Sequence, residues 1–198
     1  MKKLLPLLLI PALSACQPTL DTPLPASDLN VDQCFTLSTR LGEILLAVDT
    51  TQTPETGANF IRYADEGYYD GTLFHRVIDG FMVQAGGFSS GLERKETHAP
   101  IVNEGQAQLH NVRGTLAMAR TNHPDSATAQ FFINSVDNQS LNTFGSRAGY
   151  AVFGQVLAGM AVVDAISSVD THRQGMHGDV PVEEIAIDAL RPTRCPKI

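Results

Sequence analysis

The sequence predicts a mainly β fold, a closed antiparallel barrel of short strands capped by two α-helices. Two observations carry this prediction. Short runs of apolar and β-branched residues recur from residue 33 onward, and turn residues separate them. Two other segments, at residues 53–66 and 159–167, instead place apolar residues at helical spacing.

The predicted domain opens with a hairpin and a helix. Residues 35–39 and 44–48 alternate like two strands with one buried face, joined by a turn. Thr53 can cap the first helix through its hydroxyl, and Pro54 suits the first helical position. Gly67 is expected to end this helix. The remaining predicted strands cover residues 73–78, 81–84, 101–102, 114–120, 130–134, 151–156 and 184–190.

The first fifteen residues have the composition of a secretory signal peptide. Two lysines precede an apolar run, residues 4–13, that is too short to span a bilayer as a stable helix. Leu-Ser-Ala-Cys at 13–16 resembles a bacterial lipobox, in which the peptide is cut before the cysteine and that cysteine carries the lipid. We therefore predict lipidation of Cys16 and membrane attachment through its acyl chains. The alternative is an ordinary signal peptide cleaved after Ala15, with no lipid.

Residues 16–32 are expected to tether a folded domain to that anchor. They are rich in proline and small polar residues and show neither a helical nor a strand period. Gln17 stands where an acidic residue retains such proteins in the inner membrane. We therefore expect a periplasm-facing lipoprotein of the bacterial cell envelope, in the outer membrane rather than the inner one. A single domain then fills residues 33–198.

The charge of the chain argues against two kinds of partner. The formal net charge is −7, and removal of the two signal-peptide lysines takes it to −9. Neither nucleic acid nor an anionic lipid surface attracts a net anion, so we expect no nucleic-acid partner and no direct docking on lipid headgroups. A metal site is not expected either, because the histidines lack zinc-type spacing: His98, His110, His123, His172 and His177.

One stretch, Phe74–Gly87, stands out from the strand pattern. It sets Arg76 among apolar and amide side chains, and it closes on two glycines. A half-buried ion pair would explain an isolated arginine of this kind. Further blocks argue for chemistry instead. They are Arg-Gly-Thr-Leu-Ala-Met-Ala-Arg at 113–120, Asp-Ser-Ala-Thr-Ala-Gln-Phe-Phe-Ile-Asn at 125–134 and Gly-Tyr-Ala-Val-Phe-Gly-Gln-Val at 149–156.

In this order, the blocks resemble the motifs of the cyclophilin-type peptidyl-prolyl cis-trans isomerases, and the resemblance covers about residues 33–190. It implies the family's fold, a closed eight-stranded antiparallel barrel with two capping helices, and a monomer. It also implies the reaction, rotation about Xaa-Pro bonds. Together with the predicted signal peptide, this makes exported or envelope proteins the expected substrates. Such an enzyme assists folding, is compatible with a chaperone role, and requires no metal or cofactor.

Arg76 is the predicted catalytic residue. Rotation about an Xaa-Pro bond crosses a barrier of ~20 kcal/mol, because amide resonance is broken at the transition state. At the twisted geometry the prolyl nitrogen regains its lone pair and becomes a better hydrogen-bond acceptor. A fixed cation that donates to this nitrogen binds the transition state more tightly than either planar ground state. The permanent charge and rigid fork of arginine suit that role.

By match to the family's motifs, the proline ring is expected on Phe81, Met82, Phe132 and Leu141. Gln84 and the backbone at Ala119 and Arg120 are expected to hold peptide groups of the substrate, and Gln130 and Tyr150 are further expected substrate-binding residues. For the two phenylalanines and Met82, ordinary barrel core is the alternative, and Gln84 could instead satisfy buried backbone groups. His75 is predicted to be structural.

Two positions depart from many eukaryotic members of the family. Ser140 stands where those members carry a tryptophan, and Tyr150 stands where they carry a histidine. Loss of the indole predicts weak binding of the cyclic peptide cyclosporin, while a tyrosine ring with its hydroxyl is expected to preserve catalysis. Residues 142–149 form an insertion beside the predicted site.

Cys34 and Cys195 stand at the two ends of the predicted domain. If the first and last strands pair antiparallel, as the resemblance implies, these positions come close together, and an oxidising compartment would permit a disulfide. Such a bond would stabilise the fold by ~4–5 kcal/mol in the chain-entropy model, less any strain. Two free thiols are the alternative.

Two other functions fit parts of the sequence. Gly-Phe-Ser-Ser-Gly at 87–91 matches the G-x-S-x-G pattern of hydrolases, but residues 92–99 leave little room before Pro100 for the helix that this pattern requires. A lipid-tethered holdase or adaptor could use the same apolar groove to bind proline segments without isomerising them. Arg76 favours the enzyme, because a pure binder needs no donor aimed at the prolyl nitrogen.

Overall fold

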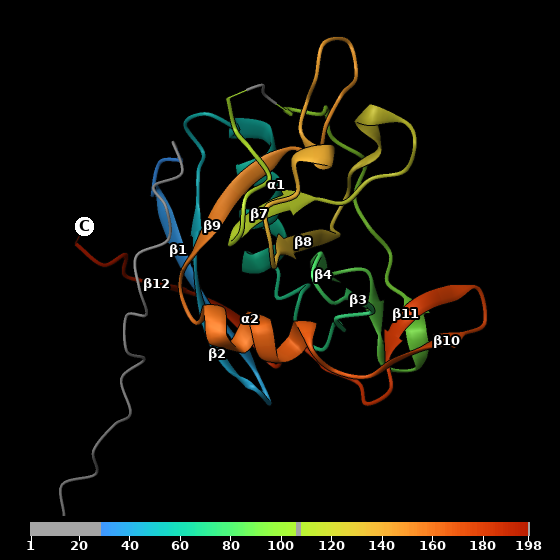
Figure 1. Cartoon of the computed structure of the whole chain (residues 1–198). Coiled ribbons are helices and arrows are strands. Elements are labelled where there is room, and N and C mark those ends of the chain that lie inside the picture. Colours follow the sequence, from blue (N-terminus) through green and yellow to red (C-terminus); the bar gives the residue numbers. More distant parts are fainter. Residues whose placement is uncertain (1–28, 106–107, 198) are drawn as a thin grey trace, which may run out of the picture.

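The computed structural model of the chain describes residues 29–105 and 108–197, and one curled antiparallel sheet dominates it (Figure 1). The predicted signal peptide, Cys16 and the tether up to residue 28 lie outside the described residues. In spatial order the eight strands of the sheet are β12 (Ala189–Thr193), β1 (Gln33–Thr39), β2 (Gly42–Val48), β9 (Val152–Ala158), β7 (Thr115–Met118), β8 (Phe131–Asn134), β4 (Met82–Ala85) and β3 (Arg76–Ile78).

Two α-helices and two small hairpins complete the described part. The helices are α1 (Pro54–Asp65) and α2 (Met160–Ser167), close to their predicted positions. One hairpin pairs β5 (Phe88–Ser89) with β6 (Glu93–Arg94), and the other pairs β10 (Thr171–Gln174) with β11 (His177–Pro181). The β10–β11 hairpin projects from the body, and β11 packs beside β3 (Figure 1).

The sheet is open, so the prediction of a closed barrel is wrong in this respect. Its two edges are β12 and β3, which are not paired with one another. A single β-bridge, between Leu73 and Ala186, and a few backbone hydrogen bonds span the region between them. Pro192 in β12 fits an edge position, because proline has no N–H to donate to a further strand.

Most predicted strands are present, with ends that differ by a few residues. Residues 101–102 contribute only a bridge between Ile101 and Ala127, and the last predicted strand begins at Ala189 rather than at 184. The β10–β11 hairpin was not predicted. All four residues of β10 are exposed, so the strand has no buried face that would produce an alternating pattern.

The N-terminus of α1 is capped differently from the prediction. The Thr53 hydroxyl donates to the carbonyl oxygen of Asp49 at 2.9 Å and makes no cap hydrogen bond. The carboxylate of Glu104 instead accepts the backbone N–H groups of Glu55 and Thr56, at 3.2 and 2.7 Å. An anion at this end also complements the helix dipole. The cap therefore comes from a distant loop, which local sequence does not indicate.

The sheet carries apolar side chains on both of its faces. On the inner face, the ring of Phe60 from α1 packs against those of Phe35, Phe131 and Phe153, with centroids 5.2 to 5.9 Å apart. The outer face carries a second group, which we call the outer cluster. Its buried members are Leu29, Met82, Leu109, Ala117, Phe132 and Val152, and its partly buried members are Ile78, Phe81, Ala119, Leu141 and Tyr150.

Residues 29–32, which the sequence assigns to the tether, pack on the domain. Leu29 is buried in the outer cluster, and the backbone N–H of Asn30 donates to the Asp49 carboxylate at 2.8 Å. The carboxylate of Asp32 accepts the backbone N–H groups of Thr50 and Thr51 at 2.7 and 2.9 Å. The folded domain therefore begins before residue 33.

Cys34 of β1 and Cys195, which follows β12, form a disulfide with their Cα atoms 5.2 Å apart. The antiparallel pairing of β1 with β12 sets Cys34 opposite Thr193 and so brings the two sulfur atoms together. The two cysteines are 161 residues apart in sequence. In the chain-entropy model, a bond that closes a loop of that size lowers the entropy of the unfolded chain. This raises the free energy of unfolding by about 5 kcal/mol. The disulfide also holds the edge strand β12 in place.

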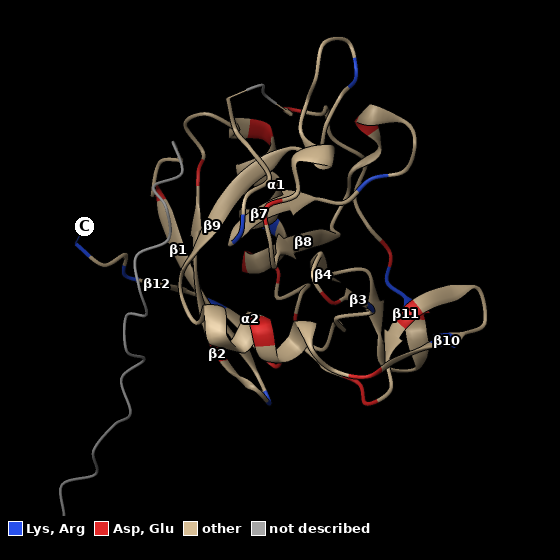
Figure 2. Cartoon of the chain, in the orientation of Figure 1, with Lys and Arg blue, Asp and Glu red and all other residues tan. Residues whose placement is uncertain are grey.

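Figure 2 shows acidic and basic residues interspersed along the ribbon rather than collected in one region. Within residues 29–105 and 108–197, no helix has both the length and the apolar character that crossing a membrane requires.

His75, directly before β3, is a buried polar residue. Its Nδ1 lies 3.3 Å from the Leu73 carbonyl oxygen, its ring packs against that of Phe88 with centroids 4.7 Å apart, and its side chain is hydrogen-bonded to Gln130. Burial lowers the pKa of His75 from 6.5 to about 4, because the charged ring would lose its hydration. The imidazole is therefore neutral at pH 7, in agreement with a structural role.

The free energy of unfolding is expected to fall with acidification through this histidine. Between pH 6.5 and 4 the unfolded chain binds a proton at His75 and the folded chain does not, so acid favours unfolding. From pH 7 to 4.5 the loss due to His75 is about 2 kcal/mol. Urea unfolding at both pH values measures it. The parent should lose about 2 kcal/mol more than a His75→Gln variant; equal losses in the two proteins would contradict the prediction.

Candidate active site

The site begins with one row of cross-strand neighbours. Arg76 on β3 lies opposite Gln84 on β4, which in turn lies opposite Phe132 on β8. Ala117 of β7 follows in the same row. Because directly opposite residues project from the same face of a sheet, these side chains share the outer face. The row therefore runs from a cation at the sheet edge to an apolar centre.

The apolar residues predicted for the site are brought together by the structure. Met82, two positions from Gln84 along β4, shares the same face and is 2% exposed, and Phe132 is 4% exposed. Phe81, Leu141 and Tyr150 lie partly buried around them, within the outer cluster. None of the five belongs to the inner core, which was the alternative assignment for three of them. The five side chains therefore form one apolar group on the outer face, in which Met82 and Phe132 are buried and Phe81, Leu141 and Tyr150 are partly exposed.

Tyr150 is held on two sides. Its ring meets that of Phe132 edge-on, with centroids 5.6 Å apart, and the guanidinium of Arg120 lies over it at 4.6 Å. Arg120 also donates to the carbonyl oxygens of Ala148 and Gly149 at 2.7 and 3.3 Å. The side chain of Arg120 therefore positions Tyr150, a role that the sequence did not indicate. A cation over an aromatic ring is worth ~0.5–1 kcal/mol when exposed.

Phe81 sits on a fixed turn between β3 and β4. Its carbonyl oxygen accepts the backbone N–H of Ser135 at 3.0 Å and the side-chain amide of Asn138 at 2.8 Å. Gly80 has a φ of 64°, a left-handed conformation that favours glycine. The turn therefore presents Phe81 at a defined place on the rim of the outer cluster.

The guanidinium of Arg76 has only long contacts. Nη1 lies 3.5 Å from Oε1 of Gln84 and 4.0 Å from Sδ of Met82, and Nε lies 4.0 Å from the carboxylate of Asp179. The side chain is 42% exposed. A guanidinium has five N–H donors, so within the described part of the chain Arg76 keeps donors available to a ligand.

A polar chain leads from Arg76 into the protein. The side-chain amide of Gln84 donates to Oε1 of Gln130 at 2.9 Å, and Gln130 is hydrogen-bonded to the buried His75. Gly87 makes room for this arrangement, since a Cβ there would lie 2.5 Å from Cδ of Gln130. Gln84 is thereby oriented with its oxygen toward Arg76. The assignment of Gln84 to buried backbone groups, the alternative from sequence, is not what the structure shows.

Ala119 and Arg120 directly follow β7. The N–H of Ala119 donates to the carbonyl oxygen of Gln130 at 2.9 Å. The N–H of Met118 donates to the carbonyl oxygen of Ala151 at 3.0 Å, so the backbone that leads into this segment is held by two hydrogen bonds. The segment borders the outer cluster through the partly buried Ala119.

Sequence reasoning missed the β10–β11 hairpin, which stands beside Arg76. Met176, His177, Gly178 and Asp179 line an open pocket of about 370 Å³ together with Arg76 and its polar neighbours. The sequence does contain a turn signal, Gly175, between the two strands of the hairpin. In the structure Gly175 has a φ of 61°. Nothing in the composition of the two strands indicated that they lie against β3.

The metal-ligand and hydrolase patterns of the sequence can be located in the described ranges. No three His, Cys, Asp or Glu side chains among residues 29–105 and 108–197 lie close enough together to hold a metal ion. The G-x-S-x-G segment at 87–91 forms β5 and part of a single 3₁₀ turn, not the strand, elbow and helix of a hydrolase.

Comparison with known proteins agrees with this geometry. The family model described as "Cyclophilin type peptidyl-prolyl cis-trans isomerase/CLD" matches residues 34–191. Over 158 residues the chain is 52% identical to peptidyl-prolyl cis-trans isomerase B of Escherichia coli K12, covering 78% of this chain and 96% of that protein. It is 50% identical over 155 residues to a peptidyl-prolyl cis-trans isomerase of Acinetobacter baylyi, covering 78% and 82%.

Solved structures show the same fold. A cyclophilin-type peptidyl-prolyl cis-trans isomerase of Cryptosporidium parvum superposes with a TM-score of 0.67 at 24% identity, covering 83% of this chain and 99% of that one. A cyclophilin of Hirschia baltica superposes with a TM-score of 0.65 at 20% identity, covering 82% and 74%. With the sequence matches and the architecture in agreement, the chain belongs to the cyclophilin family of peptidyl-prolyl cis-trans isomerases.

Proposed function

We propose that Arg76 accelerates rotation about Xaa-Pro bonds by donating a hydrogen bond to the prolyl nitrogen at the twisted transition state. The observation that carries the proposal is the row from Arg76 through Gln84 to Phe132. It sets a cation with available donors directly beside an apolar surface. A proline ring on that surface has its nitrogen close to the guanidinium, with no other catalytic group needed.

The outer cluster supplies the seat for the ring. Met82 and Phe132 form its floor, and Phe81, Leu141 and Tyr150 form its walls. Contact with these side chains excludes water from one side of the prolyl bond. The hydrogen bond from Arg76 is therefore stronger there than in bulk water, because the local dielectric constant is lower.

Arg76 lowers the barrier because its hydrogen bond strengthens as the bond twists. In the planar ground state the prolyl nitrogen shares its lone pair with the carbonyl group and is a poor acceptor. At the transition state the lone pair is localised and accepts the N–H of Arg76. Only an interaction that is stronger in the transition state raises the rate.

Gln84 and the backbone at Ala119 and Arg120 hold the peptide on either side of the ring. Gln130 supports this arrangement by fixing the amide of Gln84. The orientation matters because a small displacement of the prolyl nitrogen from the guanidinium would weaken the transition-state contact.

The substrates we propose are proline-containing segments of unfolded or flexible proteins of a bacterial envelope. Three features support this setting: the signal-peptide composition of residues 1–15, the lipobox at 13–16, and the disulfide between Cys34 and Cys195. Disulfides persist in oxidising compartments outside the cytosol. The lipid on Cys16 anchors the enzyme to the membrane leaflet and leaves the domain facing exported chains.

Arg76→Ala is expected to lower the rate of catalysed isomerisation about a hundredfold, which corresponds to ~3 kcal/mol for the loss of one preorganised donor. Arg76→Lys should recover only part of the rate, because a lysine lacks the rigid fork. NMR exchange spectroscopy of a short Xaa-Pro peptide with the soluble chain from Gln17 onward measures these rates.

Arg40→Ala is the matched control, because Arg40 is also about half-exposed and has one ion pair, with Glu183 at 3.3 Å, but lies in the turn between β1 and β2. It should leave the exchange rate unchanged. A parent that binds the peptide without accelerating exchange would instead establish a tethered binding module. An Arg76→Ala variant with the parent's rate would exclude the proposed role of Arg76.

Cys16 is expected to carry the lipid when the full chain is expressed in a bacterium with a lipoprotein pathway. Mass spectrometry should find a mature N-terminus at Cys16 with added acyl chains, and the protein should sediment with membranes. A Cys16→Ser variant, which cannot be acylated, should appear in the soluble periplasmic fraction. An unmodified Cys16 at the N-terminus of a soluble protein would show an ordinary signal peptide instead.

A further inference from the structure

We propose that the β10–β11 hairpin and Phe88 form a second subsite, which takes a large uncharged side chain, aromatic or aliphatic, from a substrate residue next to the proline. This inference rests on the proposed function and adds a preference for substrate sequence to it. The structure suggests it through an open pocket of about 370 Å³ beside the row that carries Arg76.

The pocket adjoins the proline seat without overlapping its apolar part. It shares with the site the side chains of Arg76, Gln84 and Gln130. The rest of its lining comes from His75 and Phe88 and from the hairpin residues Met176, His177, Gly178 and Asp179. With a prolyl nitrogen at Arg76, the Cα of an adjacent residue lies within about 4 Å of the prolyl Cα across one peptide unit. Its side chain can therefore enter the pocket while the ring stays on the outer cluster.

Aromatic rings make one wall of this pocket. The ring of Phe88 meets that of His75 at a centroid distance of 4.7 Å and that of His177 at 5.0 Å, both nearly edge-on. The three rings link the body of the protein to the hairpin. Phe88 is only partly buried, so part of its surface is open to a ligand. An incoming aromatic or aliphatic side chain finds apolar contact there.

Met176 marks the open end of the pocket. It is 94% exposed at the tip of the hairpin, next to Gly175. A methionine is flexible and polarisable, and it makes favourable contacts with aromatic rings and with side chains of varied shape. Its exposure leaves it free to close over a side chain that enters the pocket from the substrate.

Charges in the pocket oppose one another, which favours an uncharged occupant. The carboxylate of Asp179 lies 4.0 Å from Nε of Arg76, and both side chains are nearly half exposed. An acidic side chain would meet Asp179, and a basic one would meet Arg76. Asp179 has a φ of 58°, uncommon for a residue with a side chain, so its placement opposite Arg76 is imposed by the hairpin. The pocket therefore selects the substrate side chain by apolar contact and not by charge.

The subsite can be tested with pairs of peptides that differ only in the residue next to the proline. NMR exchange should give a kcat/KM about tenfold higher with Phe than with Ala, either before or after the proline, because burial of an aromatic side chain adds apolar contact. Glu at that position should give no gain over Ala. In Met176→Ser the preference for Phe should fall to about threefold or less, and Met176→Leu should retain it.

Phe144→Ser is the matched control. Phe144 is another large apolar residue at the tip of a projecting loop, 81% exposed, and it does not line this pocket. Its substitution should leave the ratio of Phe to Ala peptides unchanged. In the parent, the methyl resonance of Met176 should shift on titration with the Phe peptide and stay in place with the Ala peptide.

Equal rates for the Phe and Ala peptides at both positions would overturn the subsite, and so would a preference that persists in Met176→Ser. Either result leaves the proposed function standing if the Ala peptide is still isomerised by the parent and not by Arg76→Ala. Loss of catalysis with every peptide would instead contradict the function itself.

Discussion

The site depends on one constraint: a permanent positive charge has to stay hydrated while it borders an apolar surface. Arg76 satisfies it because β3 is an edge strand, and its side chain keeps 42% of its surface exposed. Along the same row the side chains become less polar toward the middle of the sheet, through Gln84 to Phe132. An ion in the middle of that row would lose far more hydration.

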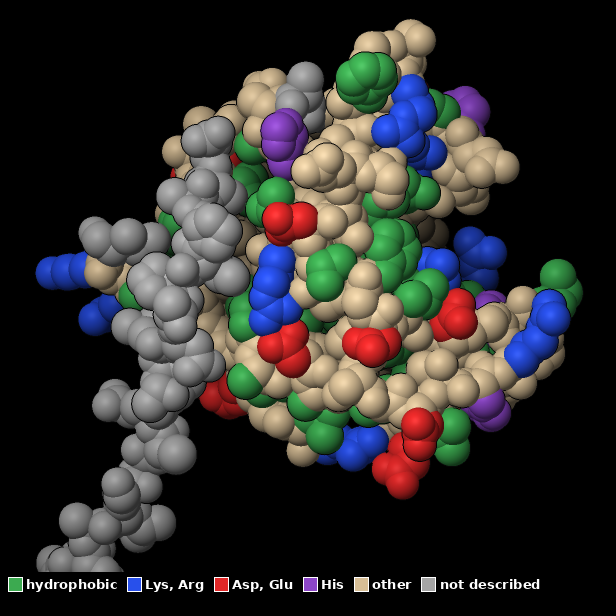
Figure 3. Space-filling model, viewed as in Figure 1, with side chains coloured by type: hydrophobic (Ala, Val, Ile, Leu, Met, Phe, Trp, Pro, Cys, Tyr) green, Lys and Arg blue, Asp and Glu red, His purple; other side chains and the backbone are tan. Residues whose placement is uncertain are grey.

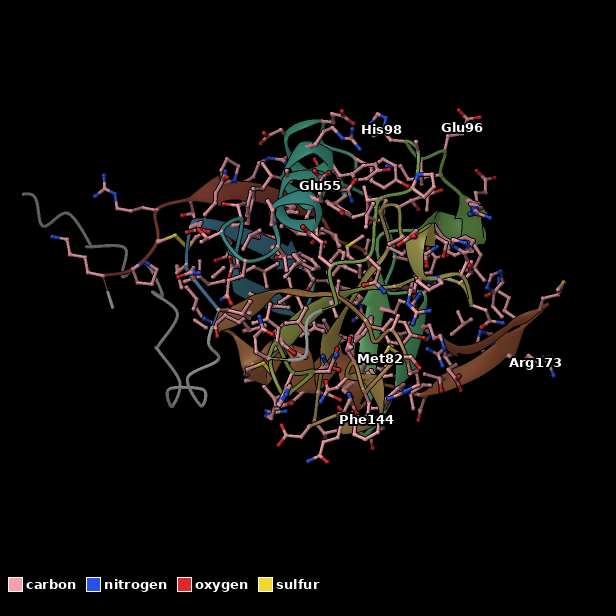
Figure 4. All side chains as sticks on the ribbon, turned by 90° about the horizontal axis from the view of Figure 1, so that it is seen from above. Glu55, Met82, Glu96, His98, Phe144 and Arg173 are labelled. Atoms are coloured by element: carbon pink, nitrogen blue, oxygen red, sulfur yellow. A yellow bond between two sulfur atoms is a disulfide. The ribbon has the colours of Figure 1, made fainter. Side chains whose placement is uncertain are left out.

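The two edges of the sheet have different surroundings. The sheet remains open between β12 and β3, and the pocket beside Arg76 is lined by the β10–β11 hairpin rather than by another paired strand. In the space-filling view, an indentation separates the projecting hairpin at the right from the loop above it (Figure 3). The disulfide between Cys34 and Cys195 secures the opposite edge of the sheet. Seen from above, Met82 lies within the body, Phe144 lies at its rim, and Arg173 lies on the hairpin that projects beside the site (Figure 4). Phe144 and Arg173 thus lie on two different projecting segments.

The sequence was sufficient to predict most strands of the sheet and the five apolar residues that the structure brings together in the outer cluster. Alternation along β4 and β8 separates inward Val83 and Ile133 from outward Met82 and Phe132, and the family resemblance predicts a binding role for the outward pair. The open sheet could not be predicted, because each strand's own pattern is the same in a closed barrel and in an open one. The cap of α1 by Glu104 and the placement of Asp179 beside Arg76 depend on loops that meet only in the folded chain.

The measurement that tests the account most directly is a structure of the soluble chain bound to a short Xaa-Pro peptide. We expect the proline ring within about 4 Å of Phe132 and Met82. The guanidinium of Arg76 should lie at hydrogen-bond distance, about 3 Å, from the prolyl peptide unit. A proline bound away from the outer cluster, or an Arg76 that stays turned to Asp179 without touching the peptide, would contradict it.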